Sequence, residues 1–246
     1  MIVNLLILLL AGLSGVVLLY TPVNWKEENF KLAISFAGGF LLSISLLHIL
    51  PDLIQSELGS FKAGLFVLAG FFLQQILEFV TDGAEHGHFH KHQNAHKHGF
   101  SFSIFLVLGL TIHSFLEGSV LAIPENVQAN TSFRNLLTGI VLHKIPASLA
   151  LSSILVCSEE KKTVALGYML IFALASPAGL LLSNALDLAS GASGFFLILL
   201  AVVCGNFLHI STTIVFESSP EHKFNFQRLL WSLLGAGVAI VAGLLN

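Results

Sequence analysis

Apolar residues run along this chain in long blocks separated by short polar stretches, and the blocks have the length of membrane spans. A bilayer core needs about 20 apolar residues per helix. The third block is the least apolar, because Gln74, Gln75 and Glu78 interrupt it. We expect an all-α integral membrane protein with eight transmembrane helices, at residues 2–20, 30–50, 61–80, 101–123, 134–156, 163–185, 194–216 and 229–245.

The composition agrees with this pattern and excludes a soluble enzyme. Hydrophobic residues make up 55 % of 246 positions and charged residues 10 %, with a mean hydropathy of +0.86, which is typical of a multi-span membrane protein. A formal charge of −3 without a long basic block gives no reason to expect nucleic acid as a partner. Cys157 and Cys204 are too few for a disulfide framework, and we expect both to pack as apolar side chains. The chain 1–246 is expected to form a single transmembrane domain.

The distribution of Lys and Arg predicts the orientation of the chain. The N-terminus lacks a positively charged start, so we expect the first span to be retained rather than cleaved. Lys62 and Arg134 fall in the loops of one side, whereas eight basic residues fall on the other. The second side is therefore predicted to be cytoplasmic and both termini outside. The eight are Lys26, Lys31, Lys91, Lys97, Lys161, Lys162, Lys223 and Arg228.

The order of the spans is compatible with an internal repeat. Three spans reverse the direction of the chain, so the first three and the last three can form an inverted repeat around the middle pair. We expect this 3+2+3 arrangement as an architecture, although no clear sequence echo accompanies it.

Three ionisable side chains fall within the fourth and fifth spans, where such groups are costly and usually functional. His113 and Glu117 are four residues apart and therefore lie on one face of a helix. His143 lies at a similar depth in the fifth span. Two imidazoles and a carboxylate suit Zn²⁺ or a similar ion, so we predict a metal site at these residues. The alternative is a buried Glu117–Lys144 ion pair, with the two histidines as interhelical hydrogen-bonding groups.

Pro146 follows His143 by three residues. Because proline lacks a backbone N–H and crowds the carbonyl of Leu142, we expect a kink beside His143. A freed carbonyl is tolerated at membrane depth where it lines a cavity, and we expect it to face the ion or its waters.

Other polar residues in the spans are candidates for the ion path. His48 and Asp52 are again four residues apart, near the outer end of the second span, and this spacing suits an outer collecting site. The alternative is ordinary interfacial polarity, with Pro51 ending the helix. His209 in the seventh span has no acidic residue at helical spacing. We expect it to line the path, with interhelical hydrogen bonding as the alternative.

The longest loop, residues 82–99, holds six histidines within thirteen residues. Imidazoles at this density bind zinc loosely and in several arrangements. Glycines and missing hydrophobic periodicity argue against a fixed fold, so we expect a cytoplasmic metal sink or sensor that is helpful to transport rather than essential. Its histidines are His86, His88, His90, His92, His96 and His98.

These motifs resemble those of the ZIP family of divalent-metal transporters. The resemblance rests on His-Ser-x-x-Glu-Gly at 113–118 and His-Lys-x-Pro at 143–146, together with Gly38-Gly39 and Leu-His-Ile-Leu-Pro-Asp at 47–52. Eight spans, outside termini and a histidine-rich third loop are also similar. The resemblance implies uptake of zinc, in some members iron or manganese, through a site between the fourth and fifth spans.

The chain departs from some members of that family at the position of a second metal. Those members have carboxylates where this chain has Lys144 and Ala147, and a Glu before Pro where it has Ser176 before Pro177. With Ser114, Lys144 and Ser176 at the second-site position, our interpretation is that the ammonium replaces the second cation. One metal then remains at His113, Glu117 and His143, and three protein ligands leave it able to depart.

We therefore predict a transporter, not an enzyme, that takes divalent ions into the cytoplasm by alternating access. Zn²⁺ is the expected substrate, with Fe²⁺, Mn²⁺ and Cd²⁺ as alternatives, and no other cofactor is expected. The rival function is an intramembrane zinc-dependent hydrolase, which needs a substrate cavity and a separate general base. A metal-sensing receptor lacks an output domain. The lipid bilayer is the surrounding partner, a homodimer stays open, and short loops favour a bacterial inner membrane.

Overall fold

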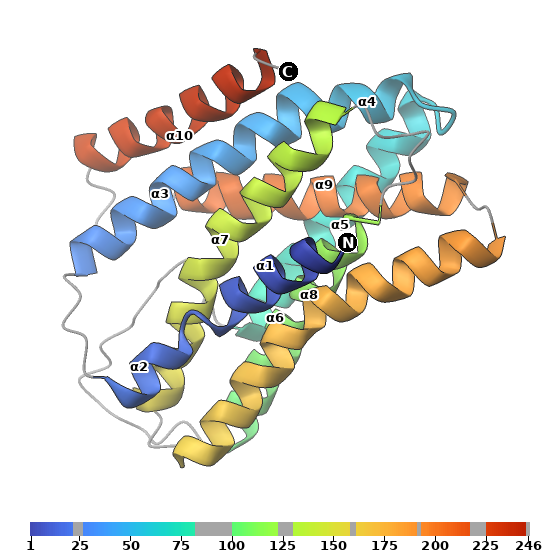
Figure 1. Cartoon of the computed structure of the whole chain (residues 1–246). Helices are drawn as coiled ribbons and strands as arrows, with labels where there is room; N and C mark the ends of the chain where they lie inside the picture. The colour runs from blue at the N-terminus through green and yellow to red at the C-terminus, as the bar shows by residue number, and fades with distance from the viewer. Residues whose placement is uncertain are drawn as a thin grey trace.

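The computed structural model describes residues 1–21, 27–81, 100–122, 130–157, 161–190, 193–216 and 225–244. These ranges contain helices and no strand (Figure 1). The helices are α1 (Ile2–Leu13), α2 (Val16–Tyr20), α3 (Glu27–Ile44), the π-helix η1 (Ser45–Ile49), α4 (Leu50–Gln55), α5 (Ser60–Thr81), α6 (Phe100–Ser119), α7 (Asn130–Cys157), α8 (Lys162–Ser190), α9 (Ser193–Phe216) and α10 (Phe226–Leu244).

The helices have the lengths that membrane crossing requires. In the described part of the chain, seven helical segments are long and apolar enough to cross a bilayer, and α6 adds a shorter apolar helix over Ile104–Ser119. Large apolar side chains such as Phe61, Phe72 and Phe79 on α5 are exposed on the outside of the bundle. An all-α membrane protein is thereby confirmed, with helices at all eight predicted positions.

The first predicted span is not one continuous helix, because it breaks between α1 and α2. The Ser14 hydroxyl donates to the Ala11 carbonyl at 2.7 Å, which competes with the helical ladder. Ser148 of α7 satisfies backbone groups on both sides of the break. It accepts from the Gly15 N–H at 2.9 Å and donates to the Gly12 carbonyl at 2.6 Å. A neighbouring helix thus supplies the partners that lipid cannot offer.

The second predicted span continues past residue 50, so Pro51 does not end it. The helix passes from α3 through the π-helical turn η1 into α4, which ends at Gln55. Pro51 lies in the first turn of α4, where a missing N–H is tolerated. The wider η1 turn comes directly before it and carries His48.

The helices pack as two bundles. In the first bundle α6 lies along α8, and the α1–α2 segment packs against α7 and α8. In the second bundle α3 lies along α10 and α5 along α9, while α3 also contacts α9 (Figure 1). Contacts of α3 with α7 and of α5 with α6 join the two bundles.

Both long pairs of the second bundle are brought together by reciprocal glycines. A Cβ on Gly39 of α3 would lie 1.9 Å from the Ser232 carbonyl oxygen of α10, and one on Gly235 would lie 2.0 Å from that of Phe36. The α5–α9 pair repeats this arrangement: Gly70 approaches the Val202 carbonyl and Gly205 that of Val67, at 1.9 and 2.0 Å. Small residues permit such close crossings in lipid. In a 3+2+3 inverted repeat α3 corresponds to α9 and α5 to α10, so the α3–α10 pair corresponds to the α9–α5 pair. The two crossings agree with this correspondence, and the repeat itself stays a prediction.

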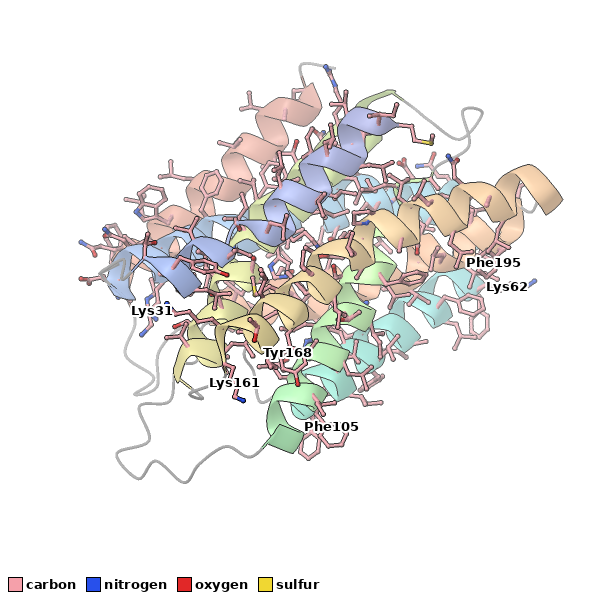
Figure 2. The ribbon with its side chains drawn as sticks, turned by 60° about the horizontal axis from the view of Figure 1, so that its bottom comes forward. Lys31, Lys62, Phe105, Lys161, Tyr168 and Phe195 are labelled. Carbon is pink, nitrogen blue, oxygen red and sulfur yellow. The ribbon has the colours of Figure 1, made fainter. Side chains whose placement is uncertain are left out.

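The labelled side chains of Figure 2 separate into two ends of the bundle. Lys31 and Lys161 lie toward one end, whereas Lys62 and Phe195 lie toward the other. This is the separation that the predicted topology requires of these lysines. Which end faces the cytoplasm remains a prediction.

Candidate metal centre

Two of the three candidate metal ligands lie on one face of α6. His113 and Glu117 are one helical turn apart, and His113 Nε2 lies 3.2 Å from Glu117 Oε1. Both side chains are only 2 % exposed. A carboxylate so deeply buried is unfavourable in an apolar surrounding unless positive charge or hydrogen-bond donors face it.

His143 of α7 joins these two residues from the adjacent helix. One ligand atom from each of the three side chains lies within 4.8 Å of the others. The His113 and His143 rings meet edge to face, with centroids 5.7 Å apart. Atoms bound to one Zn²⁺ at about 2.0–2.1 Å are at most about 4 Å apart, so small side-chain movements suffice for all three to coordinate one ion. Pro146 lies inside α7 without interrupting it.

Lys144, the residue after His143, is held beside the cluster and is 1 % exposed. Its ammonium donates to the hydroxyls of Ser114 on α6 and Ser176 on α8, the latter at 2.7 Å. It also lies 4.6 Å from the centre of the Phe172 ring, within range of a cation–π contact. The structure thus brings together Ser114, Lys144 and Ser176, which the sequence analysis assigned to one position.

The ion-pair alternative does not fit this geometry. Among the described residues, Glu117 contacts His113, whereas Lys144 donates to serine hydroxyls, and the two form no direct ion pair. The carboxylate therefore faces the two imidazoles and remains available as a ligand.

Close packing of α6 and α8 brings the two hydroxyls to the ammonium. A Cβ on Gly118 would lie 2.0 Å from the Ser176 carbonyl oxygen, and one on Gly179 would lie 2.2 Å from that of Phe115. Any side chain at either glycine would push the helices apart. The second glycine in this crossing, the Ser148 contacts with α1 and the Phe172 ring were all missed by the sequence analysis. Ser148 follows Lys144 by one turn of α7, and this spacing could have indicated that both side chains lie on the same face of the helix.

The other predicted path residues lie outside the cluster. His48, on η1, is half-buried, and its Nε2 would be 2.2 Å from a Cβ added to Gly243 of α10. Asp52 on α4 is exposed. His209 has an acidic neighbour after all, because Glu78 of α5 lies beside it. Helical spacing along α9 alone could not reveal this neighbour, because Glu78 belongs to another helix. The histidine-rich loop, residues 82–99 with His86 to His98, lies outside the described residues.

Comparison with known proteins finds similarity to zinc transporters. A family model described as ZIP zinc transporter matches residues 81–244, which include both α6 and α7. A rice protein (Oryza sativa subsp. japonica) named Zinc transporter 1 is 29 % identical over 149 residues, which cover 57 % of this chain and 42 % of that protein. The matched part is thus less than half of that relative's length.

Proposed function

The chain belongs to the ZIP zinc transporter family, and from this premise we propose that it carries divalent metal ions, chiefly Zn²⁺, through the membrane. The observation that carries the proposal is the three-residue cluster of His113, Glu117 and His143, buried between the apolar helices α6 and α7. Nitrogen and carboxylate ligands suit zinc, and three of them leave room for a water molecule. The proposal extends to this chain what the rice relative's name says of that protein.

The proposed site holds one metal ion. Lys144 carries a positive charge where a second ion would need anionic ligands, and two serine hydroxyls with an aromatic ring hold it there. A second dication beside an ammonium in a surrounding of low dielectric would be repelled strongly. Fe²⁺, Mn²⁺ and Cd²⁺ are alternative substrates, and no separate cofactor is proposed.

The proposed mechanism is alternating access with net movement into the cytoplasm. The cluster is almost closed to solvent, with His113 and Glu117 each 2 % exposed, so an ion bound there is separated from both sides. Protons compete with a metal for imidazole and carboxylate ligands, so protonation on the releasing side promotes departure. His48 and Asp52 at the outer end of the second span are proposed to collect the ion, and residues 82–99 to bind it after release.

The location and assembly of the protein remain predictions. Outside termini and a cytoplasmic loop 82–99 follow from the distribution of basic residues, and a single domain follows from the composition, whereas a homodimer stays open. The rice relative gives no support to a bacterial inner membrane. The hydrolase alternative gains nothing from the family, which is one of transporters.

Radioactive zinc uptake into proteoliposomes tests the proposed function. We expect the purified protein to accumulate ⁶⁵Zn²⁺ inside vesicles, and His113→Ala to abolish this accumulation at matched reconstitution. A protein that binds zinc through these residues and never accumulates it would not be a transporter.

A further inference from the structure

A second pair of metal-ligating side chains lies between α5 and α9, outside the central cluster. His209 Nδ1 is 3.3 Å from Glu78 Oε2. At the centre, His113 Nε2 is 3.2 Å from Glu117 Oε1. The same two ligand types therefore occur twice at nearly the same separation, once within a helix and once between two helices. Imidazole nitrogen and carboxylate oxygen both bind Zn²⁺ at about 2.0–2.2 Å, and ligand atoms about 3.3 Å apart fit one ion.

Neighbouring residues orient the Glu78–His209 pair, and other contacts already hold α5 against α9. The Phe71 ring meets the His209 ring edge to face at 4.8 Å between centroids, and this contact restricts the plane of the imidazole. The α5–α9 crossing is already held by Gly70 and Gly205. In the side-chain orientation that gives hydrogen-bond partners to both the oxygen and the nitrogen of its amide, Asn206 also donates to the Gly70 carbonyl at 2.7 Å. Two ionisable groups are a costly addition to an interface that neutral contacts already hold.

The pair is more accessible than the central cluster and lies at another depth. Glu78 is 18 % exposed and His209 8 %, against 2 % for both His113 and Glu117. Glu78 is in the last turn of α5, whereas His113 is in the second half of α6, the next and oppositely directed span. At a rise of 1.5 Å per residue the two levels differ by on the order of 15 Å. An ion at the pair would therefore be separate from one at the centre and nearer to water.

We propose that Glu78 and His209 form a second binding site for the transported divalent ion, between α5 and α9. The inference rests on the proposed function, which supplies the ion. Two protein ligands, with water completing the shell, bind less tightly than three, so the site holds the ion briefly on its way between the centre and the end of α5. The predicted topology makes this the cytoplasmic end, and hence the releasing side.

Equilibrium dialysis with ⁶⁵Zn²⁺ on the full-length protein in lipid nanodiscs tests the second site. In every protein the six loop histidines are replaced by serine, which removes their binding. The parent is expected to bind two ions with different affinities. Glu78→Gln and His209→Gln should each weaken the lower-affinity ion by at least about tenfold and leave the other unchanged. His113→Ala should do the reverse. Gln75→Ala, at an exposed neighbouring position on α5, is the matched control and should bind as the parent does.

The two glutamine variants separate metal binding from a structural role. Glutamine at either position can still form a hydrogen bond across the helix pair, so a merely structural pair predicts parent binding in both. Two ions bound with parent affinities by both variants, or only one ion bound by the parent, would overturn the second site. Uptake into proteoliposomes by the same proteins tests the proposed function separately. Full uptake by His113→Ala would refute transport through the centre. The second site is decided separately, by whether Glu78→Gln and His209→Gln weaken the lower-affinity ion in dialysis.

Discussion

Replacing Glu117 by glutamine should have the largest effect of any single change at the centre. Glutamine keeps the size of the side chain and one carbonyl oxygen, so it removes charge with little change in packing. Glu117 is the only acidic member of the cluster with His113 and His143. A bound dication would then be left in a buried site without the negative charge that this cluster supplies.

The size of the effect follows from the burial of Glu117. At 2 % exposure water screens the carboxylate very little, so the usual small value of a surface ion pair does not apply. Removing one partner of a buried charge pair costs about 3–5 kcal/mol. At about 1.4 kcal/mol per factor of ten, zinc affinity should fall by about a hundredfold to several thousandfold.

Zinc affinity by isothermal titration and ⁶⁵Zn²⁺ uptake at matched reconstitution measure this effect together. Ser119→Ala is the control, because that buried hydroxyl on α6 donates to the Phe115 carbonyl of its own helix, and it should change neither quantity by more than a few-fold. The reasoning is wrong if Glu117→Gln takes up zinc at the parent rate, or if its affinity falls no further than that of the control.

Four other outcomes are expected. Lys144→Ala should tighten zinc binding and slow release, measured by affinity and uptake rate; a loss of binding as severe as in His113→Ala would contradict it. Anomalous scattering from cadmium-soaked crystals should give one full-occupancy peak at the centre, and two such peaks a few ångströms apart would refute a mononuclear site. Deleting residues 86–98 should preserve uptake while weakening metal retention, and complete loss in a well-folded deletion would assign the loop to the path. Gly118→Ala should destabilise the protein by about 1–3 kcal/mol, seen as a lower Tm, whereas Gly167→Ala, with open space around it, should not.

The sequence predicted the positions of the spans because lipid imposes a length and a polarity that can be counted. It also identified His113, Glu117 and His143, since a polar side chain in an apolar span is conspicuous without any structure. That the structure brings these three together is a finding about geometry, and their role in metal binding still awaits the experiments above.

What the sequence did not reveal depends on contacts between helices distant in the chain. No proline marks the break at Ser14 and Gly15. Ser148, from the distant helix α7, satisfies the backbone groups there, and this contact cannot be read from the sequence. Glu78 looked like a polar interruption of a weak span until α9 placed His209 beside it. Helical spacing relates residues within one helix and carries no information about which face of another helix they meet.

The ammonium of Lys144 also has an electrical consequence. Glu117 and Lys144 contribute opposite unit charges to the same buried region, so without an ion their sum is zero, and with a dication it is +2. Moving the empty site through a transmembrane voltage then requires no electrical work, whereas moving the loaded site transfers two charges. Each charge is worth about 2.3 kcal/mol per 100 mV, so in the proposed mechanism an inside-negative voltage of that size favours an inward step of the loaded site across the whole voltage by about 4.6 kcal/mol. Only an empty site that has given up the competing protons returns without opposition from the voltage.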